Sequence, residues 1–192
     1  MPAAYVVTEG YIDAEILKRC LPEGLTRDVY IAVGEGWSSA MSLAGSILVV
    51  KARPVALVVD ADSEDEAAIE ERRDFARSFL RRTSVGVPFE VFLAVPEFEA
   101  VLFQSKAVIN HLLEKPVPDG EFEAAKHRPK KWLIAAGVGY PKDIALLLGR
   151  VTKDDLAALR SHELIRGLSA FLTQAIADNG STLGRRQRVV EL

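Results

Sequence analysis

Short apolar runs alternate with longer helical patterns through the first half of this chain. Residues 4–8, 28–33, 55–59 and 89–95 each have the length of a strand, and the stretches between them repeat apolar side chains at helical spacing. Because strands that alternate with helices pair in parallel through right-handed crossovers, the pattern predicts an α/β fold. We expect a four-stranded, mainly parallel sheet flanked by helices. The run 55–59 is wholly apolar, which indicates a strand covered on both faces.

The second half of the chain is predicted to be helical, with no further strand. Pro96 ends the fourth apolar run, and a helix is predicted from Glu97 to Leu113. Residues 114–130 are polar and contain prolines, which favours a link. Further helices are predicted at 131–136, 141–149, 153–159 and 161–177. The 192 residues can bury a sizeable core, so we expect an α/β catalytic domain at 1–113 and a helical extension at 114–192 packed on it.

Acidic residues follow three of the four predicted strands. Glu9 follows the first, Asp60-Ala61-Asp62 follows the third, and Glu97 and Glu99 follow the fourth. The carboxyl ends of parallel strands form one crevice, where ligands bind. Asp13 lies one helical turn after Glu9 and can face the same point. Clustered carboxylates repel one another unless a cation or proton compensates them, and an all-oxygen ligand set suits Mg²⁺ or Mn²⁺. The sequence therefore predicts a divalent metal site at this edge.

Two small residues accompany the acidic motifs. Gly10 permits a tight turn from strand to helix and a close approach by a phosphate. Ser63 lies beside the DxD segment and, with Glu66 three residues later, has the spacing of a capping box for the next helix. Both positions are predicted to border the site.

The net charge of −3 does not indicate nucleic-acid binding. The distribution of basic residues is more suggestive, and its alternative interpretation is a set of solvated helix faces and a loose tail. Basic groups at 126–131 and 185–188 would bring phosphates towards an acidic centre. The arginines at 72–82 are interpreted instead as a solvated helix face, because Glu70, Glu71 and Asp74 neutralise much of their charge. The single cysteine fits a reducing cytoplasm, and no apolar run approaches the roughly 20 residues that span a bilayer.

This order of motifs resembles the Toprim domain, which topoisomerases, primases and OLD-family nucleases share. The resemblance covers roughly residues 4–103, through the segments VVTEGYIDAEIL, VALVVDADSEDE and LAVPEFEAVLF. It implies a Toprim-like (Rossmann-like) sheet. It also implies that one or two divalent ions are held by Glu9, Asp13, Asp60, Asp62 and one or both of Glu97 and Glu99. The turn formed by Gly34, Glu35, Gly36, Trp37 and Ser38 is similar to a glycine-containing loop that borders the site in that family.

The resemblance also implies a catalytic lysine after the sheet, placed to stabilise charge on the scissile phosphate. Lys142 is the expected counterpart, with Lys130 and Lys131 as alternatives. No GxxxxGK[ST] P-loop is present, so ATP hydrolysis by that route is not expected. No tyrosine has the context of a topoisomerase nucleophile. We therefore expect a stand-alone Toprim unit that can form a homodimer, or a subunit that works with a separate ATPase.

The leading functional hypothesis is metal-dependent cleavage of phosphodiester bonds in DNA or, second, RNA. Glu9, Asp60, Asp62 and Lys142 are the expected catalytic residues. With only one metal ion, Glu9 would act as a general base through a water molecule. The alternative is a non-catalytic or partner-dependent Toprim subunit of a larger nucleic-acid-processing or defence complex. A primase, a haloacid-dehalogenase phosphatase and a phosphoreceiver fit less well, since each expects accessory parts or acidic pairs that this chain lacks or places elsewhere.

Overall fold

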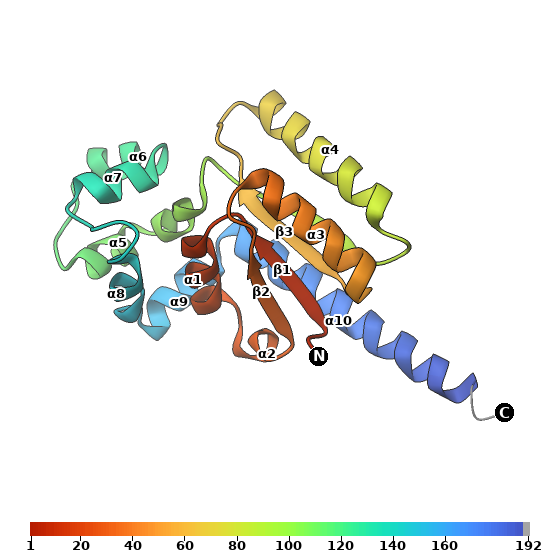
Figure 1. The fold of residues 1–192 in the computed structure, drawn as a ribbon. Coiled ribbons are helices and arrows are strands. Elements are labelled where there is room, and N and C mark those ends of the chain that lie inside the picture. The colour runs from red at the N-terminus through yellow and green to blue at the C-terminus, as the bar shows by residue number, and fades with distance from the viewer. Residues whose placement is uncertain (190–192) are drawn as a thin grey trace.

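A computed structural model of the chain describes the backbone of residues 1–189 and the side chains of residues 1–178. The basic group predicted at 185–188 lies outside the described side chains. Four parallel strands form one sheet in the order β2-β1-β3-β4 (Figure 1). The strands are β1 (Ala4–Thr8), β2 (Val29–Val33), β3 (Val55–Asp60) and β4 (Phe89–Ala94). This confirms the predicted α/β fold class with a fully parallel sheet.

The register of the strands aligns their carboxyl ends. Thr8, the last residue of β1, pairs with Val33 of β2 and with Val58 of β3, and Asp60 at the end of β3 pairs with Ala94 of β4. All of β1 and the first five residues of β3 are buried, as expected for apolar strands in the centre of a covered sheet. The loops that leave β1, β3 and β4 therefore start at one edge.

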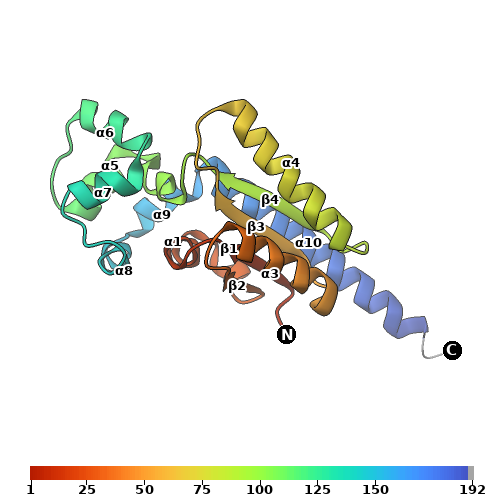
Figure 2. The same cartoon turned by 45° about the horizontal axis from the view of Figure 1, so that its top comes forward.

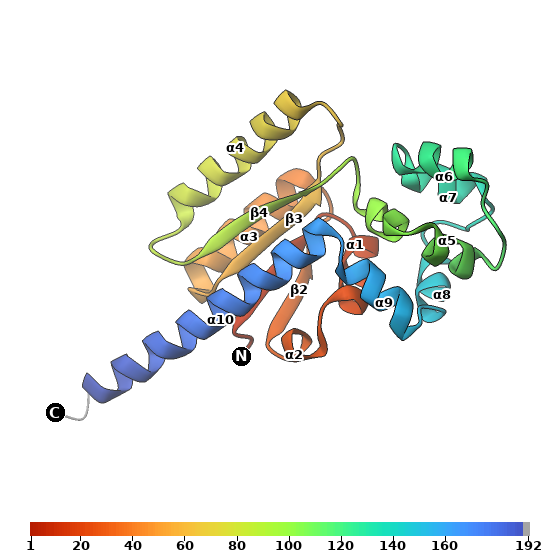
Figure 3. The ribbon, with the colours of Figure 1, turned by 180° about the vertical axis from the view of Figure 1, so that it is seen from behind.

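Helices cover both faces of the sheet. On one face lie α3 (Trp37–Lys51) and α4 (Glu66–Thr83), which bury a core against Val7, Leu57 and Val91 (Figure 2). On the other face lie α1 (Tyr11–Cys20) and α10 (Glu163–Val189), which crosses in front of the strands in the view from behind (Figure 3). Along each strand successive side chains point to opposite faces, so neighbouring residues enter different cores.

The remaining helices gather at the end of the sheet where the acidic loops emerge (Figure 1). They are α5 (Lys106–Leu113), α6 (Asp119–Lys126), α7 (Pro129–Ala135), α8 (Ile144–Gly149) and α9 (Lys153–Arg160), preceded by the 3₁₀ helix η1 (Phe98–Gln104). One cluster of buried residues runs from β1 and β3 through η1 to α10. The division of the chain at residue 113 stays a prediction, since both parts share this core.

Two local predictions are wrong, and one short helix was not predicted. The single helix predicted from Glu97 to Leu113 is broken at Ser105, whose extended backbone ends η1 and whose hydroxyl accepts a hydrogen bond from the Ala107 N–H at the start of α5. The segment 114–130, predicted as a link, contains α6. Phe122 and Ala125 lie on one side of this helix and are buried, although the rest of its sequence is polar. A further short helix, α2 (Glu23–Thr26), was not predicted. Within the described residues, no helix combines the length and apolarity needed to cross a membrane.

We expect Gly34→Ala to destabilise the fold strongly. A Cβ at Gly34 would lie 2.3 Å from the Cα and 2.5 Å from the N of Ala40, and these backbone atoms cannot move without shifting α3. Overpacking of this kind costs about 3 kcal/mol. Urea unfolding measures the loss, and Gly24→Ala is the control, since a Cβ there meets nothing within 4 Å. Equal stability of the two variants would contradict the close packing of this turn.

Candidate metal centre at the carboxyl ends of the strands

Four carboxylates converge where β1 and β3 end. Glu9 follows β1, Asp13 lies in the first turn of α1, Asp60 is the last residue of β3, and Glu99 lies in η1. These four residues form what we call the carboxylate group. Asp13 and Glu99 are buried at 6% and 2% exposure, although acidic side chains are usually solvated. The charges of Glu9 and Glu99 raise the pKa of both Asp13 and Asp60, so these four residues lie near one another, and their binding of a metal ion stays a prediction.

Hydrogen bonds from the protein orient three members of the carboxylate group. The Gly10 N–H donates to Asp13 Oδ2 at 2.7 Å, and the Phe98 N–H donates to Asp60 Oδ1 at 2.8 Å. The Tyr140 hydroxyl donates to Glu99 Oε1 at 2.7 Å. Each bond fixes one oxygen of its carboxylate. The fourth member differs, because Glu9 Oε2 is buried without a hydrogen-bond partner.

The electrostatics show that negative charge is crowded here. Burial, together with the nearby Glu99 and Glu9 carboxylates, raises the pKa of Asp13 to about 7, against the hydrogen bond from Gly10. Burial likewise raises the pKa of Asp60 to about 8, together with the charges of Asp13, Glu99 and Glu9. Without a compensating cation, protons are held in this group near neutral pH.

Glu97 borders the carboxylate group and connects it to α7. Its Oε1 accepts a hydrogen bond from the Lys130 N–H at 2.8 Å. Burial raises its pKa, and the charge of Glu99 acts in the same direction. The Lys130 ammonium lies 4.7 Å from the centre of the Tyr140 ring and is close enough to Asp13 to lower that carboxylate's pKa.

Asp62 does not join the carboxylate group. Its side chain is 64% exposed and forms an ion pair with Arg72 at 2.8 Å, while the Arg72 guanidinium stacks 4.0 Å from the centre of the Trp37 ring. The prediction placed Asp60 and Asp62 together just after a strand at 55–59. The strand reaches Asp60, and Asp62 has a left-handed φ of 53°, so its side chain turns to Arg72 and not to the carboxylate group.

Lys142 is also not brought to the acidic residues. Its side chain is exposed, and no ion pair or hydrogen bond of the described residues joins it to a carboxylate. Lys130, one of the two alternatives, is the lysine beside the group. The segment that contains Lys142 contributes Tyr140 instead, which sequence reasoning missed as a site residue. Burial, with its hydrogen bond to Glu99, raises the pKa of Tyr140, so the hydroxyl stays protonated and donates.

The predicted glycines border the site for specific reasons. Gly10 has an extended backbone, and its lack of a side chain leaves room for Asp13, since a Cβ would lie 3.3 Å from Asp13 Oδ2. The Gly34 N–H donates to the Thr8 carbonyl at 2.9 Å, and the Gly36 N–H donates to the Glu9 carbonyl at 3.0 Å. Gly36 has a φ of 108°, a conformation that glycine adopts without strain. This loop therefore fixes the backbone on which Glu9 stands.

The two predicted serines lie at the margin. Ser38 is exposed in the first turn of α3. Ser63 does not cap α4, because that helix begins at Glu66 and the Asp65 carboxylate accepts the capping bond from the Ala68 N–H at 2.9 Å. Ser63 Oγ instead accepts a bond from the Asp65 N–H at 3.0 Å and shapes the loop before the helix. The predicted capping box at Ser63 is therefore wrong.

The donor set suits a hard divalent cation. All donors are oxygens, one buried oxygen lacks a partner, and two carboxylates have raised pKa values, each of which a cation would relieve. Among the described side chains, no three His, Cys, Asp or Glu residues form a ready-made metal cluster. The carboxylates are near enough to raise one another's pKa values, but as placed they do not make up a metal site.

One solved structure has a similar fold. The C-terminal region of the OLD protein of Xanthomonas campestris pv. campestris superposes with a TM-score of 0.54 and 12% sequence identity, over 94% of this chain and 98% of that one. The fold is Toprim-like. No protein-family model and no curated protein matches the sequence. At this identity the likeness concerns the path of the chain, and function has to be argued from the site.

Proposed function

We propose that this chain is a divalent-metal-dependent nuclease that hydrolyses phosphodiester bonds of DNA or RNA, related to the OLD-family Toprim nucleases. The observation that carries the proposal is the buried carboxylate group, in which one Glu9 oxygen has no partner and Asp13 and Asp60 retain protons near neutral pH. Such a group is costly for a protein to maintain, which indicates a functional site. The similar fold of an OLD C-terminal region supports the same assignment.

Glu9, Asp13, Asp60 and Glu99 would hold Mg²⁺ or Mn²⁺, with Glu97 at the margin. When bound, such an ion supplies an acidified water and neutralises charge on a phosphate oxygen. The protein's own contribution is orientation. The N–H groups of Gly10 and Phe98 hold Asp13 and Asp60, and the Tyr140 hydroxyl holds Glu99. Each bond occupies one carboxylate oxygen, and the second oxygen would be available to a cation once the side chains draw together around it.

Lys130 would provide the positive charge that the mechanism requires beside the scissile phosphate. We expect Lys130→Met to lower the cleavage rate about a hundredfold, a typical loss for one electrostatic contact in a transition state. The comparison is Lys142→Met, which removes an exposed lysine and should have little effect. Single-turnover cleavage at saturating protein measures both variants. If only Lys142→Met lowers the cleavage rate strongly, Lys142 is the catalytic lysine, as the sequence predicted, and Lys130 is not.

The direct test is cleavage of plasmid and of single-stranded oligonucleotides with Mg²⁺ or Mn²⁺. The proposal predicts products with either metal and none in EDTA. Calorimetric titration of the same preparation with Mn²⁺ shows whether an ion binds. Absence of both binding and cleavage would contradict the proposal.

A partner-dependent subunit is the second candidate, and one observation favours it. The described carboxylates do not form a closed metal cluster by themselves, so a partner chain would complete the site. This reading predicts Mn²⁺ binding with negligible cleavage by the isolated chain, and light scattering then shows whether a second copy is the missing partner.

A further inference from the structure

A second surface with binding chemistry lies beside the carboxylate group. A groove of about 400 Å³ runs between the loops that follow β3 and β4 and the start of α7. Asp62, Pro96 and Glu97 line its sheet side, and His127, Arg128, Lys130, Lys131 and Ile134 line its helical side. We call it the basic groove. It is open to solvent and large enough for one nucleotide unit of a longer strand.

Part of the positive charge of the basic groove is unpaired within the described part of the chain, whereas Lys130 lies near Glu97 and His127 is bonded to Glu64. Arg128 and Lys131 are exposed, and neither has an ion-pair partner among the described residues. The arginines of α4 provide the contrast, since Arg72, Arg73 and Arg77 pair with Asp62, Glu70 and Glu90, respectively. On the sheet side of the groove, Asp62 is thus already neutralised by Arg72. Unpaired cations at the rim favour an anionic ligand from outside.

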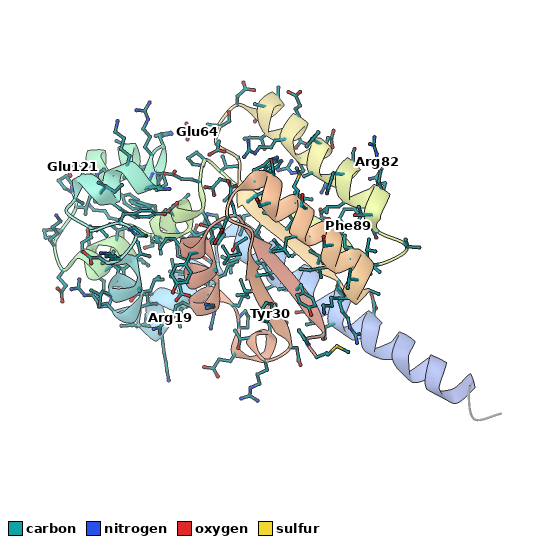
Figure 4. The ribbon with its side chains drawn as sticks, viewed as in Figure 1. Arg19, Tyr30, Glu64, Arg82, Phe89 and Glu121 are labelled. Atoms are coloured by element: carbon teal, nitrogen blue, oxygen red, sulfur yellow. The ribbon has the colours of Figure 1, made fainter. Side chains whose placement is uncertain are left out.

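The basic groove and the carboxylate group share a wall. Glu97 lines the groove, is bonded by the Lys130 N–H, and lies close enough to Glu99 for that charge to raise its pKa. On the opposite side, His127 Nδ1 lies 2.6 Å from Glu64 Oε1, which ties the α6–α7 corner to the loop before α4. Figure 4 shows Glu64 between these two parts of the molecule. A ligand in the groove therefore points towards the carboxylates.

We propose that the basic groove binds the phosphate backbone of a nucleic-acid strand, with a phosphate held by Arg128 and Lys131, next to the nucleotide presented to the carboxylate group. This inference rests on the proposed function and names how its substrate is held. A nucleic-acid strand fits because the unpaired side chains of Arg128 and Lys131 can bind oxygens of one phosphate or of two successive phosphates. Ile134, 51% exposed at the groove, offers an apolar contact to a sugar or base. A small free anion would use the cations but leave Ile134 without a role.

The test is binding, measured without cleavage. Fluorescence anisotropy of labelled single-stranded and duplex DNA oligonucleotides in EDTA compares the wild-type chain with Arg128→Gln/Lys131→Gln. We expect the affinity to fall at least about tenfold at low salt, and the slope of log affinity against log salt to decrease by about two, one for each lost phosphate contact. Both residues are exposed, so circular dichroism should show an unchanged fold.

The matched control is Arg81→Gln/Arg82→Gln. It removes the same charge from exposed positions at the far end of α4, where Figure 4 labels Arg82. Its affinity and salt slope should stay within about twofold of wild type. Equal losses in both variants, no loss in the groove variant, or no binding by the wild-type chain would each overturn the groove assignment.

The outcomes separate this inference from the proposed function. If the chain binds DNA through the groove but neither binds Mn²⁺ nor cleaves, the groove assignment stands and the nuclease proposal fails. If the wild-type chain cleaves with metal and the groove variant binds DNA unchanged, the nuclease proposal stands and the groove assignment fails. Displacement of the oligonucleotide by millimolar inorganic phosphate as effectively as by unlabelled DNA would reduce the groove to a simple anion site and contradict the proposal.

Discussion

Asp60→Asn is expected to abolish metal-dependent cleavage, with a loss of about a thousandfold or more, while making the metal-free protein more stable. The change removes one charge from the carboxylate group but keeps its shape, because an asparagine oxygen can still accept the hydrogen bond from the Phe98 N–H. Losing a metal-binding carboxylate removes the electrostatic stabilisation that dominates such reactions. The gain in stability follows because three carboxylates repel less than four. Residues arranged for function often cost stability in this way.

Single-turnover cleavage and thermal unfolding in EDTA measure the two effects of Asp60→Asn. Asp154→Asn is the matched control, since it makes the same chemical change at an exposed position in the first turn of α9. It should leave cleavage unchanged and alter stability by no more than about 0.5 kcal/mol. If Asp60→Asn retained cleavage, or if it destabilised the metal-free protein, Asp60 would be a structural residue rather than part of a metal site.

The metal-free protein is expected to lose about 2 kcal/mol of stability between pH 6.5 and pH 8, and divalent cations should restore it. The pKa values of Asp13 and Asp60 are about 7 and about 8 in the folded chain, against 3.8 as the ordinary value. In this window the folded chain binds more protons than the unfolded chain, so its stability falls as the pH rises. Burial lowers the pKa of His162 and gives the opposite slope below about pH 6.5, which is why the window starts there.

Thermal unfolding at the two pH values, in EDTA and in Mg²⁺, tests this dependence. Stabilisation by Mg²⁺ should be larger at pH 8, where the cation no longer displaces protons. The Asp60→Asn variant should show a shallower slope than wild type in EDTA. Stability that is constant or rises between pH 6.5 and pH 8 in EDTA would show that the carboxylates are not crowded.

The sequence predicted the sheet and the placement of most acidic residues because both depend on local patterns. Each apolar run is long enough to be a strand, and parallel strands end together, so Glu9 and Asp60 had to meet. The position of Asp13 near the site was predictable because it follows Glu9 by one helical turn. Most later helices were also predictable as helices. The break between η1 and α5 was missed because it depends on a local cap at Ser105, and α6 was missed because Phe122 is buried only by tertiary contacts.

The site residues that sequence analysis misplaced depend on geometry beyond the local pattern. The DxD spacing put Asp62 beside Asp60 after the third strand, but the left-handed backbone of Asp62 sends its side chain to Arg72. The segment at 139–142 was noted for its lysine, whereas its tyrosine reaches Glu99. Lys130 approaches the carboxylates because α7 packs on η1, a long-range contact that no spacing in the sequence reveals.

The most direct measurement is anomalous diffraction from crystals of the chain soaked in Mn²⁺. Our account predicts at least one strong manganese peak within coordination distance of oxygens from Glu9, Asp13, Asp60 and Glu99, with Tyr140 still bonded to Glu99. A crystal with no peak at the carboxyl ends of β1 and β3, or with manganese bound only at Asp62, would contradict it.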